Sequence, residues 1–195
     1  GFIIKDIIDY TIAENEEIYL EGTGSLLLDR VNKKAYCALS DRAHEDLIIE
    51  FCEDFDYAPI IFNAFQTKED KRLPIYHTNV MMALGEHIAI VCLDTIDDKK
   101  EKKLVLKNLK EDQKEIIEIS EKQMHYFAGN MLQVKGANES KYMVMSKTAH
   151  DSLALGQIKK IEAHAQILSC DLQTIETCGG GSARCMMAEV FLPTE

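Results

Sequence analysis

The hydrophobic and polar positions of this chain follow a pattern that occurs three times. Each unit has two short apolar runs, a longer stretch with one apolar face, and a third short apolar run. Short apolar or β-branched runs predict strands, and apolar residues three and four positions apart predict one face of a helix. The order strand, strand, helix, strand therefore recurs, and its closing strands centre near Ile60, Ile117 and Ile167, which gives a period of about 50 to 57 residues.

The expected elements can be placed along the three units. The first unit has a turn and strand over 19–29, a strand over 35–39, a helix over about 42–54 and a strand over 58–65. The second unit has strands over 77–84 and 87–93, a helix over about 98–111 and a strand over 115–120. The third unit has strands over 129–134 and 142–145, a helix over about 147–164 and a strand over 166–172. A fourth unit starts at Gly179, and the apolar run after Cys185 predicts its strand. No unit is large enough to bury its helix alone, so we expect the units to pack around a common axis.

Composition supports a globular α/β domain and narrows the partners. The 195 residues are 46% hydrophobic and 28% charged, which is typical of one domain with a real core. The net charge of −11 disfavours nucleic acid and anionic membrane surfaces as partners. The six cysteines include no CxxC pair, which disfavours zinc and a disulfide framework and favours a reducing, cytoplasmic setting.

Four chemically useful residues occupy equivalent places in the repeat. Glu21, His77, Asn130 and Cys185 each lie where a loop leads into the first strand of a unit. Equivalent junctions of a pseudo-symmetric array meet at one end of the axis, so we expect these four side chains to share one cleft. A thiol served by an imidazole and a carboxylate is a pattern for nucleophilic catalysis.

Each of these residues also has a structural alternative. Cys185 could be an inert core thiol after the flexible turn Gly179–Gly181, His77 a structural histidine, and Glu21 a cap or turn residue. Asn130 could serve only its turn, since asparagine favours left-handed backbone. The three glycines do not form a phosphate loop, because no Gly-Lys-Ser/Thr follows them.

Four segments resemble one known superfamily in its motif order. They are Leu20-Glu21-Gly22-Thr23-Gly24-Ser25, Tyr76-His77-Thr78-Asn79-Val80-Met81, Phe127-Ala128-Gly129-Asn130-Met131 and Gly179-Gly180-Gly181-Ser182-Ala183-Arg184-Cys185-Met186. From about Glu16 onward the chain resembles the pentein, or guanidino-group-modifying, superfamily, which includes arginine deiminase, dimethylarginine dimethylaminohydrolase and the amidinotransferases. Within it, the chain is most similar to the bacterial amidinotransferase-like group that contains the citrulline utilization hydrolases.

The resemblance implies an α/β propeller of five pseudo-symmetric ββαβ modules around a central site. About three and a half of the five modules can be counted here. We therefore expect residues 1–195 to be the C-terminal part of a single catalytic domain, with one to two modules, on the order of 80 to 110 residues, before Gly1.

The resemblance also implies the site roles. Cys185 would attack the central carbon of a guanidino or ureido group and form a covalent thiouronium-type intermediate, His77 would move protons, and Glu21 would orient His77 or bind substrate nitrogens. Substrate contacts are implied for Asn79, Asn130, Ser182 and Arg184, although a loop hydrogen bond for Ser182 and an ion pair for Arg184 are the alternatives. The mechanism needs no metal and no organic cofactor.

Asn79 departs from several relatives, which have an aspartate that grips the guanidinium. Loss of that charge favours a neutral ureido group such as that of citrulline. The expected partner is a small guanidino or ureido molecule, and the protein could also form a homo-oligomer or associate with a preceding segment. Two other functions remain open: an amidinotransferase that moves an amidino group between amines, and a pentein-fold binding protein without turnover.

Overall fold

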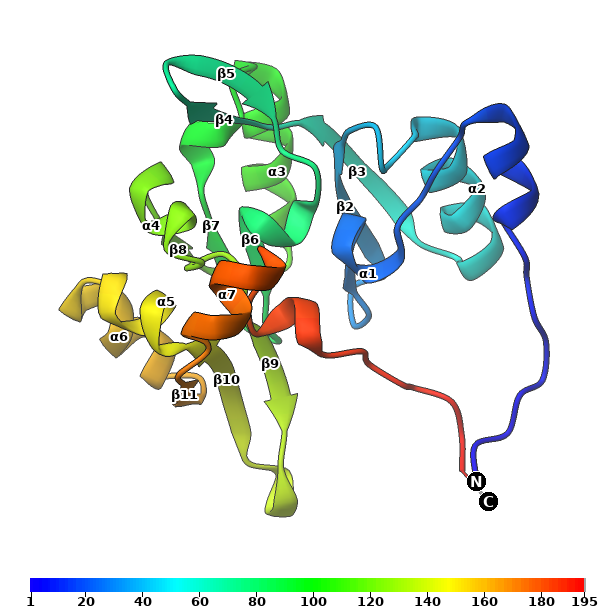
Figure 1. The fold of residues 1–195 in the computed structure, drawn as a ribbon. Helices are drawn as coiled ribbons and strands as arrows, with labels where there is room; N and C mark the ends of the chain where they lie inside the picture. The colour runs from blue at the N-terminus through cyan, green and yellow to red at the C-terminus, as the bar shows by residue number, and fades with distance from the viewer. Residues whose placement is uncertain (195) are drawn as a thin grey trace.

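The structure, a computed structural model that describes residues 1–194, contains three ββαβ modules (Figure 1). Their elements are β1 (Leu26–Asp29), β2 (Lys34–Leu39), α2 (Glu45–Phe55) and β3 (Ala58–Asn63); β6 (Met82–Leu84), β7 (Ile88–Val91), α3 (Lys99–Glu111) and β8 (Glu115–Glu118); and β9 (Leu132–Lys135), β10 (Lys141–Ser146), α5 (Lys147–Ser152), α6 (Leu155–Glu162) and β11 (Gln166–Cys170). In each sheet the middle strand pairs antiparallel with the first strand and parallel with the last. The predicted α/β fold of repeated ββαβ modules is confirmed.

The sequence explains the local structure of these elements. Helix α3 begins behind Asp98, whose carboxylate accepts from the backbone N–H groups of Lys100 and Glu101, and it buries Val105 and Leu109. Its lysines occupy the remaining face, as the periodicity predicts. Strand β7 is buried along its whole length, as expected for an apolar run in the middle of a covered sheet.

The modules interlock through their helices. Helix α3 of the second module packs against β3 of the first, and α6 of the third packs against β8 of the second. The first strands of the three modules are neighbours, since β6 contacts both β1 and β9. One hydrophobic core consequently runs through all three modules. Each helix among residues 1–194 is too short or too polar to span a lipid bilayer.

A buried ion pair joins the first module to the second. The Lys114 ammonium lies 2.8 Å from a carboxylate oxygen of Asp29, and the two side chains are 1% and 3% exposed. Lys114 also donates to the carbonyl groups of Gly85 and Glu86, and Asn32 donates two further hydrogen bonds to Asp29. Burial by itself would raise the pKa of Asp29, but the hydrogen bonds from Lys114 and Asn32 hold that pKa below its ordinary value.

Several predicted elements differ in detail. The strand expected over 77–84 begins as a 3-10 turn at Thr78–Val80, and the helix expected over 147–164 is two helices, because the backbone is extended at Leu153 and Ala154. The hairpin of β4 (Phe65–Lys68) and β5 (Lys71–Pro74) was not predicted, nor were α1 (Gly22–Ser25), α4 (Glu121–His125) and α7 (Gln173–Gly179).

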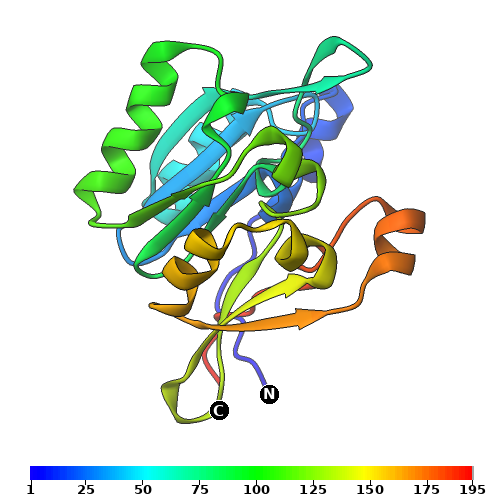
Figure 2. The same cartoon turned by 90° about the vertical axis from the view of Figure 1, so that its left-hand side faces the viewer.

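The strand expected after Cys185 is wrong. A 3-10 turn at Arg184–Met186 takes its place, and the chain then runs to an isolated bridge between Phe2 and Thr194, which brings the two termini together (Figures 1 and 2). A strand needs a neighbouring backbone to accept and donate its hydrogen bonds, and up to Thr194 this segment has such a neighbour only near Ile3. Three modules are therefore complete within residues 1–194, and the fourth unit contributes its loop without a strand.

Candidate active site

Glu21 and His77 form a close pair although they come from different modules. The Nε2 atom of His77 lies 2.6 Å from Oε2 of Glu21, and Arg42 Nη1 lies 3.5 Å from the same oxygen. A carboxylate in this position fixes the orientation of the imidazole. The geometry therefore suits His77 to proton transfer.

Thr78 fixes the backbone that carries His77. Its hydroxyl donates to the carbonyl of Ser25 at 2.5 Å and accepts from the N–H of Ala38 at 2.8 Å. Both contacts are buried and both reach the first module. The position of His77 beside Glu21 is thus set by the residue that follows it.

Gly24 provides the space for the imidazole, and this yields a first prediction. A Cβ atom at position 24 would lie 2.8 Å from Nδ1 of His77, which the Glu21 hydrogen bond holds in place. Gly24→Ala should therefore displace the ring and lower kcat by about 10- to 100-fold. The measurement is steady-state turnover. Gly156→Ala, where a Cβ atom meets open space, is the matched control, and equal rates for the two variants would contradict the prediction.

Cys185 lies against two asparagine amides. Its Sγ atom is 3.1 Å from Nδ2 of Asn130 and 3.8 Å from Nδ2 of Asn79, and Asn130 also donates to the backbone carbonyl of Asn79. Oδ1 of Asn130 accepts from the N–H groups of Arg184 and Cys185. The side chain of Asn130, only 3% exposed, is therefore a hub between the thiol and the His77 segment rather than only a turn residue. The two amide groups therefore fix the position of the sulfur atom.

A cavity of about 170 Å³ opens beside the thiol. Gly180, Gly181, Asn130 and Tyr76 line it together with Cys185, and a Cβ atom on Gly181 would come within 2.9 Å of the Cβ of Cys185. Burial raises the pKa of Tyr76, and the charge of the nearby Cys185 raises it further. The glycine loop thus lets the backbone pass close to the thiol and leaves room for a small ligand.

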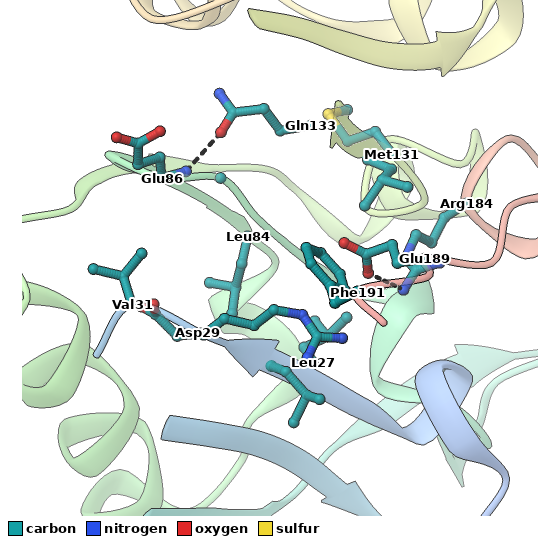
Figure 3. A pocket seen from close by; sticks show the side chains of 14 residues that line it. Leu27, Asp29, Val31, Leu84, Glu86, Met131, Gln133, Arg184, Glu189 and Phe191 are labelled. Atoms are coloured by element: carbon teal, nitrogen blue, oxygen red, sulfur yellow. Dashed lines mark hydrogen bonds and ion pairs between the residues drawn. The ribbon is translucent and has the colours of Figure 1, made fainter. Parts of the chain in front are cut away.

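Ser182 and Arg184 do not join this site. The hydroxyl of Ser182 donates to Glu176, which also accepts from Thr148. The guanidinium of Arg184 contacts the carbonyl of Met187 and the carboxylate of Glu189, at the edge of a second pocket, where Leu27, Leu84 and Phe191 lie (Figure 3). The polar atoms of both residues are engaged away from Cys185, as the structural alternatives expect, and their substrate role stays a prediction.

Sequence reasoning missed three residues that line the cavity. Gln66 and Lys68 come from the β4–β5 hairpin, and His125 comes from the end of α4. The turn of the hairpin, Glu69-Asp70, has positive φ at both residues, a conformation that glycine or asparagine usually signals. Without a glycine or asparagine at the turn, the sequence does not predict the two strands of this hairpin.

Comparison with solved structures supports the fold. The chain superposes on ArgZ, an arginine dihydrolase from the ornithine–ammonia cycle in cyanobacteria, with a TM-score of 0.68 and 15% identity over 88% of this chain and 23% of that one. It matches unliganded AgrE with a TM-score of 0.69 and 20% identity, covering 90% of this chain and 23% of that chain. It matches SxtG, an amidinotransferase from Microseira wollei, with a TM-score of 0.53 and 12% identity, covering 88% of this chain and 46% of that chain. The chain therefore spans less than half of the length of each of these proteins.

Sequence comparison gives the family. No curated protein matches this chain. The family model described as N,N dimethylarginine dimethylhydrolase, eukaryotic, matches residues 1–192, which is nearly the whole chain. The chain therefore belongs to the N,N-dimethylarginine dimethylhydrolase family, within the pentein superfamily of guanidino-modifying enzymes.

Proposed function

We propose that this protein is a cysteine-dependent hydrolase of a guanidino or ureido group, with citrulline or an arginine derivative as substrate. The observation that carries the proposal is a pair of contact groups carried by one segment: His77 contacts Glu21, and Asn79, two residues further on, lies with Asn130 against the thiol of Cys185. The family match supports the reaction class. The roles of the residues are part of the proposal.

The steps follow from the residue chemistry. The thiolate of Cys185 attacks the central carbon of the substrate, a C–S bond forms, and a tetrahedral adduct results. A C–N bond then breaks, and the nitrogen leaves as ammonia or an amine with a proton from His77. The covalent intermediate that remains is of the thiouronium type for a guanidino group and of the thiocarbamate type for a ureido group. His77 next removes a proton from water, the oxygen attacks the same carbon, and the C–S bond breaks to restore the thiolate.

Asn79 supports a neutral ureido substrate such as citrulline. Its Oδ1 atom is buried and has no hydrogen-bond partner among residues 1–194, so it is an acceptor that a substrate N–H group can satisfy. Within the same residues, no carboxylate side chain lines the cavity beside Cys185. A cationic guanidinium would lack a counter-charge in that cavity, whereas a ureido group needs only hydrogen bonds.

The test is turnover by the full-length protein. It is incubated with citrulline, arginine, agmatine and dimethylarginine, and ammonia, amine and the remaining product are measured. Hydrolysis of at least one compound is expected. Release of ammonia or an amine that requires a second amine as acceptor would instead favour an amidinotransferase, the class of the structurally similar protein SxtG. Absence of turnover on all compounds would leave the binding-protein alternative.

Asn79→Asp tests the ureido preference. The new carboxylate adds a counter-charge for a guanidinium, so the ratio of kcat/KM for citrulline to that for arginine should fall by about 10- to 100-fold. Kinetics with both substrates give this ratio. The exposed Asn138→Asp is the control and should leave the ratio unchanged. An unaltered ratio in Asn79→Asp would contradict the assignment of Asn79.

A further inference from the structure

Helix α3 carries a row of lysines along its solvent-facing side. Its buried residues Val105 and Leu109 lie on one side of the helix, and at about 100° per residue five exposed lysines fall within a sector of about 100° on the other. These residues, which we call the lysine stripe, are Lys99, Lys100, Lys103, Lys107 and Lys110. Only Lys107 has a carboxylate within 4.0 Å in residues 1–194, that of Glu111 at 3.6 Å on the same helix.

Helix α2 carries a stripe of the opposite charge. Its buried residues Leu47, Ile48 and Cys52 face the first sheet, and four exposed carboxylates occupy the outer side of the helix. These residues, which we call the acidic stripe, are Glu45, Asp46, Glu50 and Glu53. The ion pairs of the described chain involve none of these four. Each helix therefore leaves charge of a single sign for a partner.

The two stripes match in spacing as well as in sign. Both helices carry a row with a four-residue interval, formed by residues 45, 49 and 53 on α2 and by residues 99, 103 and 107 on α3. Residues four apart are neighbours on a helix surface, so the two rows have the same pitch. Each stripe also adjoins an exposed aliphatic side chain: Ile49 on α2 is 39% exposed, and Leu104 on α3 is 40% exposed. A contact between the stripes would pair charges and remove both aliphatic groups from water.

The stripes do not meet within one chain, because α2 and α3 pack on opposite faces of the first sheet (Figure 1). Ile48 of α2 shares a hydrophobic cluster with Cys37 of β2, whereas Val105 of α3 belongs to the cluster that contains Tyr36. Adjacent residues of a strand point to opposite faces, so the sheet separates the two helices. A second copy of the chain can supply the complement that the first lacks.

We propose that this protein associates with itself, with the acidic stripe of α2 in one copy against the lysine stripe of α3 in another. The net charge of −11 makes two copies repel each other, but at 0.15 M ionic strength charges more than about 8 Å apart are largely screened, whereas opposed side chains in contact are not. The helices are only about 16 and 20 Å long, so the contact is small and the association reversible. The inference is independent of the proposed function, because neither stripe lines the cavity beside Cys185.

Charge reversal on each stripe, followed by mixing, tests the inference. The α3 variant carries Lys99→Glu, Lys103→Glu and Lys107→Glu. The α2 variant carries Asp46→Lys, Glu50→Lys and Glu53→Lys. Sedimentation equilibrium at about 10 μM to 1 mM should show that the unmodified full-length protein associates and that each variant alone does so about 100-fold more weakly. An equimolar mixture of the two variants should regain the association, because each stripe then meets its opposite.

A control variant separates the contact from overall charge. It changes the net charge by the same amount as the α3 variant, on α4, α5 and α6, through Lys122→Glu, Lys147→Glu and Lys159→Glu. It should associate more strongly than the α3 variant. The α2 variant reduces the overall negative charge, so weaker association there reports the lost contact and not general repulsion.

Three results would overturn the inference: an unmodified protein that stays monomeric throughout this range, an α3 variant that associates as the control does, or two folded variants whose mixture stays apart. Circular dichroism checks that each variant keeps its helices. The unmodified protein gives a readout that needs no variant, since raising the salt from about 0.15 to 0.5 M should weaken the association by about tenfold. Association that is unchanged or stronger at the higher salt concentration would also overturn the inference.

Discussion

Cys185→Ala is expected to lower turnover by about 10³-fold or more, because the variant has no atom that can form the covalent intermediate. The loop should keep its shape in this variant, since Asn130 holds the backbone N–H groups of Arg184 and Cys185 and Ser182 holds Glu176. Two measurements check the result: the rate of ammonia or amine release, and the mass of acid-quenched protein. A mass increase that reports the covalent intermediate should appear in the unmodified protein and be absent from Cys185→Ala.

Cys178→Ala provides the matched control. Cys178 is an exposed thiol on α7, in the same segment, and among the described residues the hydrogen bonds of Asn79 and Asn130 to sulfur go to Cys185 and not to Cys178. Its replacement should leave turnover within about twofold and should preserve the mass increase. Turnover that survives in Cys185→Ala, or an equal loss in both variants, would refute the assignment of the nucleophile.

Lys114→Ala is expected to lower the free energy of unfolding by about 3–5 kcal/mol. The substitution leaves the buried carboxylate of Asp29 without its cation and the carbonyls of Gly85 and Glu86 without their donor. Urea denaturation of the purified protein measures the change. Lys147→Ala, which removes an exposed pair with Asp151, is the control and should leave the free energy of unfolding nearly unchanged.

Two further measurements examine the origin of this loss. The double variant Asp29→Leu with Lys114→Met should recover most of the stability, because no unpaired charge is then buried. The depressed pKa of Asp29 contributes stability above its ordinary value of about 3.9, and this contribution is lost as the pH falls through the lower, folded-state pKa. Lys114→Ala should therefore be less sensitive than the unmodified protein to acid below about pH 4. An equal acid response of the two proteins would contradict this account.

The repeat of the fold could be predicted because each module repeats one hydrophobic pattern. Strands β2 and β3 and helix α3 lie within two residues of their expected bounds, since buried runs and capping residues are local signals. The β4–β5 hairpin could not be predicted in this way, because Glu69 and Asp70 adopt left-handed backbone without glycine. The strand expected after Cys185 was wrong, because strand formation depends on a partner that the local sequence does not reveal.

The candidate site could be predicted only in part. Equivalent positions in the repeat indicated that Glu21, His77, Asn130 and Cys185 would share one cleft. The structure brings Glu21 to His77 and Asn130 to Cys185, and a common cleft for all four stays a prediction. The direction of the Arg184 side chain could not be predicted, because in a 3-10 turn adjacent side chains point to different sides. Lys68 was not predicted to line the cavity, because the β4–β5 hairpin that carries it was not predicted.

The contact between Asn130 and Cys185 has a consequence for how the protein is made. The two residues are 55 positions apart, and the thiol follows Glu21, His77 and Asn130 in the chain. At about 5 to 20 residues per second, a ribosome adds Cys185 roughly 3 to 11 seconds after Asn130. The β1–β2–β3 and β6–β7–β8 sheets can pair during that interval, because all of their strands precede Asn130 in the chain. The reactive thiol consequently enters a site whose amide and imidazole groups are already in the chain, which shortens the time during which it is exposed without them.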